Sequence, residues 1–563
     1  MTEASAQAAR VSFADLFTPK LFTVLREGYG AAQLRADALA GLTVAIVALP
    51  QSMAIAIASG ASPAQGLVTA IVGGFVVSAL GGSRFQIGGP ADAFIVLVAS
   101  TVAAHGMNGL VLAVAMSGLM LTAIGLMRLG AYIKFVPYPV TVGFTAGIAI
   151  IILASQLKEL FGLTLGGAEP GPFVEKLEAL WRAAPSFNLA SFAIAAGVIG
   201  AIFLLKRLRP HWPGLLIAVA GAAIAAALLN LPIDTIGSRF GALPRFLPAP
   251  TLPELDVHLA LAVLPNAIAF TLLGAIESLL SAVVADGMTG RRHRSNCELA
   301  AQGVANLASS FFGGIPVTGT IARTATNVRA GAHGPVAGML HAVFLLLFML
   351  IAAPLAAFIP MAALGGVLAT VAWNMIERPA IANLFKASRG DAVILVVTFA
   401  LTIFRDLTEA IVVGFALGSV LFIHRMSQTT AVAEEPFVTE DRADDANGAR
   451  MAYDSNEAAD PSVVVYRISG VFFFGAAASI GAVLDRIGDA NRALIVDFSA
   501  VPFVDSTAAR TMESLARNLG KRGAKLYLTG ATASVRRDFD RNGLEGVLYR
   551  DSVEAALVDA REL

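Results

Sequence analysis

The stretch that decides the fold is GGPADAFIVLVAS at residues 88–100, and it has a counterpart in GGIPVTGTIARTATN at residues 313–327. Each stretch places Gly and Pro where an apolar span should begin, and Pro suits the first turn of a helix. Non-helical backbone at membrane depth is tolerated only inside protein or beside a water-filled cavity. The two stretches therefore predict two broken helices.

The spacing indicates that the two breaks are equivalent, because Pro50 precedes Pro90 by 40 residues and Glu277 precedes Pro316 by 39. Interrupted helices at corresponding positions in two halves mark the midplane substrate site of a transporter. Two half-helix N-termini that face each other aim free backbone N–H groups and positive dipole ends at one point, which favours an anion. The alternative is that Gly and Pro are simply frequent in transmembrane helices.

The composition is that of a polytopic membrane protein, since 56% of the 563 residues are hydrophobic and only 14% are charged. A formal net charge of +0 gives no support to nucleic-acid binding. The one cysteine, Cys297, has no second thiol for a disulfide or a metal site. We find no nucleotide-binding Gly-rich loop, partnered nucleophile or cluster of metal ligands, so we expect no enzyme, cofactor or ATP-driven pump.

Apolar windows of roughly 17 to 25 residues recur between residues 38 and 425, which we interpret as the membrane domain. Clear windows are 63–81, 108–127, 135–156, 190–205, 213–230, 333–353 and 407–424. Lys and Arg gather at 206–209, 291–294 and 378–389, and short loops rich in these residues are typically cytoplasmic. This pattern fits about fourteen transmembrane helices, a cytoplasmic N-terminal segment (residues 1–37) and a cytoplasmic C-terminus.

The composition changes after Arg425 to an acidic stretch, residues 426–461, which we interpret as a linker. Beyond it, residues 462–476, 493–499 and 524–530 have the pattern of strands, and residues 506–520 have helical spacing. This alternation predicts a small α/β domain over residues 462–563.

Ionisable residues inside apolar spans are costly and are therefore functional candidates. Glu277 lies in such a span, with Ser281 one helical turn later on the same face. Its carboxyl group could take up and release a proton as an anion moves, or it could be hydrogen-bonded between helices. Arg323 could add positive charge to an anion site or pair with Glu277.

Two further polar residues leave alternatives open. Asp92 lies in the first turn of a half-helix, where it would satisfy the helix dipole and repel an anion, so it is protonated, binds a coupling cation or turns away. Gln51 follows Pro50 inside an apolar span, as a substrate donor or as a packed amide that bridges two helices.

Four segments resemble the sulfate permease (SulP) family, the counterpart of the animal solute carrier 26 anion transporters. They are ALPQSMAIAIASG at 48–60, GGPADAF at 88–94, GAIESLLSAVVADGMTG at 274–290 and NLASSFFGGIPVTGTIARTATNVRAGA at 306–332. The resemblance implies seven-plus-seven inverted repeats that are divided into core and gate domains, with the third and tenth spans as facing half-helices.

The resemblance also implies site residues. Gln51 matches a substrate-facing glutamine, and Glu277 matches an acidic position in the eighth span. In sodium-dependent bicarbonate members that position is aspartate with a threonine one turn later, so Glu277 and Ser281 favour proton coupling over sodium. Ala322 stands where animal members often have serine, and Asp92 replaces a small or hydroxylated residue. The expected substrate-binding set is Gln51, Ala91, Ala93, Phe94, Thr318, Gly319, Thr320, Ile321, Ala322 and Arg323, and the expected ion-coupling set is Glu277, Ser281 and Asp92.

The C-terminal segment resembles a STAS domain, through DFSAVPFVDSTAART at 497–511. A serine at such a helix start is phosphorylated in anti-sigma factor antagonists, which makes Ser506 and Thr507 regulatory candidates. The alternative is ordinary helix N-capping, because Asp, Ser and Thr all favour that position. The resemblance implies a module for dimerisation, trafficking or binding of a cytoplasmic protein partner.

We therefore expect a multi-pass homodimer in the bacterial inner membrane that moves a small anion by proton-coupled symport and alternating access. Sulfate, bicarbonate and C4-dicarboxylates are the candidate substrates. The alternatives are sodium-coupled transport or exchange, a nucleobase permease of the same architecture, and a membrane sensor whose output is the STAS domain.

Overall fold

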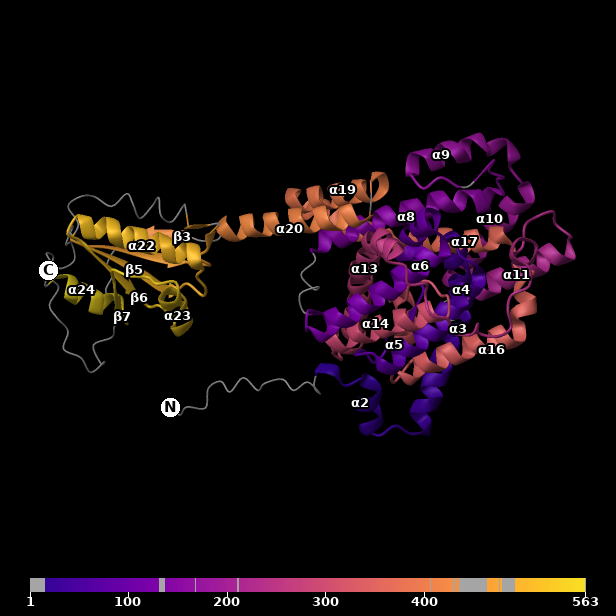
Figure 1. Cartoon of the computed structure of the whole chain (residues 1–563), viewed down its shortest axis with the longest axis horizontal. Coiled ribbons are helices and arrows are strands. Elements are labelled where there is room, and N and C mark those ends of the chain that lie inside the picture. Colours follow the sequence, from indigo (N-terminus) through magenta and orange to yellow (C-terminus); the bar gives the residue numbers. More distant parts are fainter. Residues whose placement is uncertain are drawn as a thin grey trace. The chain divides into compact units, whose positions relative to one another are not determined.

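The computed structural model describes residues 16–130, 137–167, 169–209, 212–405, 407–428, 431–434, 463–474, 476–477 and 492–561. The chain divides into two compact units, Met1–Phe415 and Ala416–Leu563. Figure 1 shows the first as a bundle of helices and the second as a sheet covered by helices.

The first half of the helical unit contains long apolar helices and one interrupted helix. Its elements are α2 (Lys20–Arg26), α3 (Ala31–Ala58), α4 (Pro63–Val68), the π-helical turn η1 (Thr69–Gly73), α5 (Gly74–Leu80), β1 (Gly88–Gly89), η2 (Asp92–Phe94), α6 (Ile95–Leu126), α8 (Tyr138–Phe161), α9 (Phe173–Arg182), η3 (Ala184–Ser186), α10 (Leu189–Leu208), α11 (Gly214–Leu228) and α12 (Ile236–Phe240).

The second half repeats the plan of a long helix, a short two-residue strand and a new helix. Its elements are α13 (Val257–Thr289), α14 (Ser295–Phe311), β2 (Thr318–Gly319), α15 (Ile321–Arg329), α16 (Val336–Ala356), α17 (Met361–Met375), α18 (Arg378–Ala387), α19 (Arg389–Phe404) and the first part of α20 (Leu407–Gln428), which continues into the second unit.

The helices of this unit pack as two groups around one continuous apolar core. In one group α6 packs on α13 and α14, and α3 packs on α16 and α15; in the other, α8 packs on α17 and α19, and α10 packs on α11 and α17. Small residues let the backbones approach closely. A methyl group at Gly118 of α6 would lie 2.8 Å from the carbonyl oxygen of Gly303 on α14.

Eight helices within the described ranges are long and apolar enough to cross a membrane. They include most of the predicted windows, for example Tyr138–Phe161, Val336–Ala356 and Glu409–Gln428. The window at 213–230 forms the shorter α11, and α14, α17 and α19 are also shorter than 18 residues.

The second unit is a five-stranded sheet in the order β3-β4-β5-β6-β7, with β3 antiparallel to β4 and the others parallel. The strands are β3 (Ala431–Glu434), β4 (Val463–Ser469), β5 (Ala493–Ala500), β6 (Lys525–Thr529) and β7 (Val547–Arg550). Alternate residues of β5 pack on opposite faces. Leu494 and Val496 join the core with α22 (Ser506–Lys521) and α23 (Ala533–Arg541), whereas Ile495 packs with α24 (Val553–Arg561).

Two sequence expectations in this unit differ from the structure. The strand expected over 462–476 ends at Ser469, because Gly470 takes a left-handed conformation (φ 94°) that turns the chain out of the sheet. Inside the expected linker, residues 431–434 form the edge strand β3, since AVAE pairs in register with residues 466–469 of β4. Residues 435–462 of that linker lie outside the described residues.

Candidate functional site

The two helix-breaking stretches meet, as the sequence predicts. β1 and β2 pair antiparallel, with Gly88 opposite Gly319 and Gly89 opposite Thr318. A helix begins directly after each strand: η2 and α6 follow β1, and α15 follows β2. Two helix N-termini therefore start at one buried crossing, and the first N–H groups of each have no acceptor inside their own helix.

Side chains form hydrogen bonds with the N–H and carbonyl groups of the non-helical backbone on both sides of the crossing. Asn306 donates to the carbonyl oxygen of Val317 (2.8 Å) and accepts from its N–H (2.9 Å). The hydroxyl of Thr69 in η1 accepts from the N–H of Ile315 (2.8 Å). Thr324 accepts from the N–H of Ile87 (3.1 Å). Because buried backbone groups without partners are costly, these contacts explain how broken helices can persist inside the bundle.

The predicted hydroxyl groups of β2 and α15 are part of this scaffold. Thr318 donates to the carbonyl oxygen of Gly274 (3.1 Å), and Thr320 donates to that of Ile87 (3.2 Å). Gly319 lies against Gln86, since a methyl group there would stand 1.7 Å from the Gln86 side-chain nitrogen. These three residues therefore shape the crossing through contacts inside the protein.

Arg323 is the cation of the crossing. Its side chain is 1% exposed, and its terminal nitrogens Nη1 and Nη2 have no hydrogen-bond partner among the described residues. Nη1 lies over β1, because a methyl group at Gly89 would stand 2.6 Å from it. No ion pair joins Arg323 to Glu277 in the part of the chain that the structure describes, so the pairing considered from the sequence is absent there.

Gln51 links Arg323 to Asp92. Its Oε1 accepts from Nε of Arg323 (3.4 Å), and its Nε2 donates to Oδ2 of Asp92 (3.1 Å). Asp92 therefore faces the crossing and does not turn away, which removes one of the three roles that the sequence allowed for this residue. Its Oδ1 is buried and unpartnered within the described residues. The amide of Gln51 also bridges helices, as a packed amide would.

Glu277 lies near this network without joining it. The residue is 9% exposed and makes neither hydrogen bond nor ion pair with the described residues. It interacts electrostatically with Asp92. Ser281 is fully buried and donates to Thr324 (3.0 Å). Ser281 thus supports the hydroxyl that holds Ile87, and the Glu277 carboxyl has no partner among the described residues.

The apolar residues predicted for the site divide into two sets. Ala91, Ala93 and Phe94 are buried, and the Phe94 ring packs on Phe270 with centroids 5.8 Å apart. Ile321 and Ala322, in the first turn of α15, are exposed. Burial around η2 and exposure around α15 indicate that the crossing is more accessible from the α15 side.

Sequence reasoning missed His341 on α16. Its side chain is fully buried, and neither ring nitrogen has a partner among the described residues. A methyl group at Gly74 would lie 3.9 Å from its Cε1 and 2.9 Å from the carbonyl oxygen of Gly88, so the ring stands behind β1. A lone histidine in an apolar helix was the available signal.

The remaining predicted residues lie elsewhere. Ser506 and Thr507 are exposed at the start of α22, but the N-cap is Asp505, whose carboxylate accepts from the N–H of Ala508 (2.9 Å). Cys297 is buried, with its thiol near the carbonyl oxygens of Phe17 and Leu80. Among the residues that the structure describes, no three His, Cys, Asp or Glu side chains gather as metal ligands.

Comparison with known families and sequences gives a consistent result. The model of the sulfate permease family matches residues 34–398, and that of the STAS domain matches residues 456–559. "Putative sulfate transporter YvdB" of Bacillus subtilis (strain 168) is 37% identical over 92% of this chain and 95% of its own length. "Bicarbonate transporter BicA" of Synechocystis sp. is 32% identical over 90% of both chains.

Solved structures share the fold. The murine Solute Carrier 26 family member A9 anion transporter, in the inward-facing state, aligns with a TM-score of 0.85 over 100% of this chain and 97% of its own, at 20% identity. The transmembrane domain of a cyanobacterial BicA aligns with a TM-score of 0.60 over 68% of this chain and 98% of its own, at 32% identity. The chain therefore belongs to the sulfate permease family, a family of membrane transporters and not of enzymes, and it carries a STAS domain at its C-terminal end.

Proposed function

We propose that this protein is a secondary active transporter that binds a small anion at the crossing of β1 and β2. The observation that carries the proposal is Arg323, a guanidinium group that is 1% exposed and whose two terminal nitrogens have no partner among the described residues. Within the described residues the Asp92 carboxylate reaches Arg323 through Gln51 and leaves its two terminal nitrogens unpaired, so an anion at this place would offset the cost of burying the cation. The free N–H groups at the two helix starts point to the same ligand chemistry.

The substrate is a divalent or monovalent oxyanion or carboxylate, because a guanidinium fork matches the geometry of such groups. The names of the relatives, a sulfate transporter and a bicarbonate transporter, support sulfate and bicarbonate as candidates. A C4-dicarboxylate remains the third. We infer that Arg323 and the helix starts hold the anion, while Gln51 keeps Arg323 and Asp92 in place.

Glu277 is the proposed proton carrier. It is buried beside Asp92 and lacks hydrogen bonds to the described residues. Uptake of a proton there would remove the repulsion between two buried carboxylates and would coincide with the arrival of an anion nearby. Sodium coupling through Glu277 and the lone pairs of the Ser281 oxygen, whose hydrogen is donated to Thr324, is the alternative use of the same position. Two competing hypotheses are exchange without coupling and a sensor whose output is the STAS domain.

Several features of the organisation belong to the same proposal. Residues 38–425 form the membrane domain, which works by alternating access, and residues 462–563 form the STAS domain. The basic loops favour the bacterial inner membrane with both termini in the cytoplasm. The protein is a homodimer, and the exposed Ser506 and Thr507 are available to a kinase or a protein partner.

The test is uptake of labelled sulfate, bicarbonate and fumarate into proteoliposomes, with and without an inward proton gradient. We expect the gradient to stimulate uptake of one of them by the native chain and not by Glu277→Gln. Glu298→Gln is the matched control, because Glu298 is also buried in the bundle but accepts from the N–H of Ser83 and the amide of Gln302. This control should respond to the gradient as the native chain does.

Three outcomes would contradict the proposal. If the native chain moved none of the three anions, the sensor hypothesis would replace transport. If Glu277→Gln kept the full response to the proton gradient, Glu277 would not carry the proton, whereas uptake by the native chain that ignored the gradient would favour exchange without coupling.

A further inference from the structure

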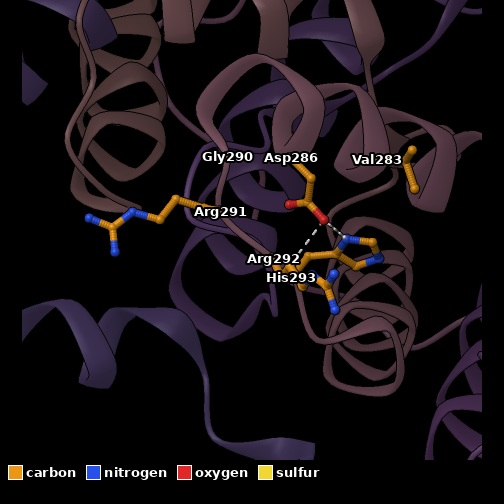
Figure 2. Close-up of a pocket in the computed structure, with 6 residues that line it drawn as sticks. All are labelled: Val283, Asp286, Gly290, Arg291, Arg292 and His293. Carbon is orange, nitrogen blue, oxygen red and sulfur yellow. Dashed lines mark hydrogen bonds and ion pairs between the residues drawn. The ribbon is translucent and has the colours of Figure 1, made fainter.

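A cavity lies where α13 ends and the chain turns into α14. Its volume is about 420 Å³, and it is lined by Val283, Asp286, Gly290, Arg291, Arg292 and His293. In Figure 2, Asp286 and His293 face each other with Arg292 beside them, whereas Arg291 extends away from them to the left and Val283 lies to the right. The crossing of β1 and β2 contributes no lining residue, so this cavity is a separate feature.

The cavity carries net positive charge. The one carboxylate in it, Asp286, is engaged by His293, whose Nδ1 lies 2.7 Å from Oδ2 and whose backbone N–H donates to the same oxygen (3.1 Å), as the dashed lines in Figure 2 show. Arg291 and Arg292 are exposed, and their guanidinium groups form no hydrogen bond or ion pair with the described residues. An anion entering here would therefore meet Arg292 and Arg291, of which Arg291 also interacts electrostatically with the Glu27 carboxylate after α2, and a carboxylate already occupied by its own partner.

The short helix α2 adds an apolar surface beside the cavity. Arg294, next to His293, donates to the carbonyl oxygen of Thr18 and to the hydroxyl of Thr23 (both 3.1 Å), which ties α2 to this turn. Phe22 and Leu25 on α2 are 50% and 48% exposed. Exposed apolar side chains on a helix that also carries basic residues are typical of contact with a membrane surface.

The position along α13 fits the same surface. The apolar sequence of this span ends at Asp286, within one turn of the helix end at Thr289. Val283, which lines the cavity, is 45% exposed and belongs to the apolar part of the span. The cavity thus joins apolar and cationic groups at the level where a span leaves the hydrocarbon core, and headgroup phosphates lie at that level.

We propose that this cavity binds the phosphate headgroup of an anionic phospholipid, with Arg291 and Arg292 as its cationic partners and Val283 beside its acyl chains. The lipid would brace the α13–α14 turn together with α2. The inference depends on the chain being embedded in a bilayer and not on which anion it transports.

The test compares binding of phosphatidylglycerol and phosphatidylcholine to the purified full chain by native mass spectrometry, from mixed micelles that contain equal amounts of both. We expect the native chain to retain phosphatidylglycerol preferentially. The double variant Arg291→Gln/Arg292→Gln should lose roughly 10- to 30-fold in apparent affinity, since each basic residue near a membrane surface contributes about fivefold. Thermal unfolding of both chains confirms that the variant is folded.

The matched control removes the same charge from another basic loop. Arg207 and Arg209, at the end of α10, are exposed and line no part of this cavity, so Arg207→Gln/Arg209→Gln should keep the preference of the native chain. Equal losses in the two double variants would overturn the proposal in favour of general charge attraction. Equal retention of the two lipids by the native chain would also overturn it. Complete displacement of the lipid by inorganic phosphate would assign the cavity to a free anion and not to a lipid.

Discussion

Two segments meet at the crossing, and we call them the first arm (residues 85–94) and the second arm (residues 313–323). The two arms share one backbone plan and carry opposite charges. β1 leads into η2 with Asp92 in its first turn, and β2 leads into α15 with Arg323 in its first turn. Gln51 contacts both side chains. The comparison teaches that the paired helix starts create a place for an anion, whereas Arg323 makes that place positive and Asp92 limits how positive it becomes.

Each arm is also braced from the opposite half of the chain. Gln65 and Thr69, in the first half, bond to Gly313 and Ile315 of the second arm. In return Thr324 and Asn327, in the second half, bond to Ile87 and Phe85 of the first arm. Because neither arm can shift without breaking the bonds of the other, the crossing should move as one body during alternating access.

The largest loss of stability should come from replacing Asn306, a side chain that makes two hydrogen bonds to the second arm. Asn306→Leu leaves the N–H and the carbonyl oxygen of Val317 without partners, and we expect a loss of ~2–6 kcal/mol in the free energy of unfolding. Asn306→Asp keeps the acceptor and should lie between this variant and the native chain. Thermal unfolding in detergent measures both, and equal melting temperatures in all three chains would contradict the brace.

Because the two arms carry opposite charges, removing the charge of each should change substrate affinity differently. Arg323→Gln removes the cation, and we expect the initial uptake rate at low substrate concentration to fall by ~10- to 100-fold, as for loss of charge-assisted hydrogen bonds. Asp92→Asn removes the opposing charge and should leave the KM unchanged or lower it.

Arg329→Gln is the control for that pair, because Arg329 is exposed on the same helix. Its uptake should match that of the native chain. A higher KM in Asp92→Asn than in Arg323→Gln would reverse the roles of the two arms.

The side chain that holds the first arm, Thr324, should contribute less to stability than Asn306, which holds the second arm. Thr324→Val takes the acceptor from the N–H of Ile87 and from the hydroxyl of Ser281. Because a hydroxyl can rotate to another acceptor and a backbone N–H cannot, we expect a loss of ~1–3 kcal/mol in stability. Thr324→Ser retains the hydroxyl and should restore most of it. A melting temperature below that of Asn306→Leu would show that the first arm, and not the second, is the more firmly held.

The smallest effect should follow from crowding Arg323 without removing it. A methyl group in Gly89→Ala would press on Nη1 of Arg323, so we expect the KM for the transported anion to rise by ~3- to 10-fold, a shift of roughly 1 kcal/mol in binding. Gly197→Ala, on α10 with open space around it, is the matched control. An unchanged KM in Gly89→Ala would mean that the anion does not need Arg323 in its present place.

Much of this arrangement can be predicted from sequence. The GGP and GGIP motifs locate both arms, since adjacent Gly and Pro residues disfavour a continuous helix, and the apolar windows locate most of the long helices. The order of strands and helices in the STAS domain follows from the change between alternating and helical periodicity. Glu277 and Arg323 stand out because charges are rare inside apolar spans.

The contacts between the halves could not be predicted in the same way. The Gln65–Gly313 and Thr324–Ile87 bonds join residues that lie 248 and 237 positions apart, and no local pattern specifies such partners. Gln51 bridges Asp92 and Arg323 only because three separate elements converge. His341 gave no motif at all, although its burial behind β1 makes it part of the same region.

The most direct test of anion binding at Arg323 is an experimental structure of the full chain with the transported anion bound. Our account predicts density for the anion between the first turns of η2 and α15, within hydrogen-bond distance of the Arg323 guanidinium group. Density for the anion at another place, with the terminal nitrogens of Arg323 paired to Asp92, would contradict it.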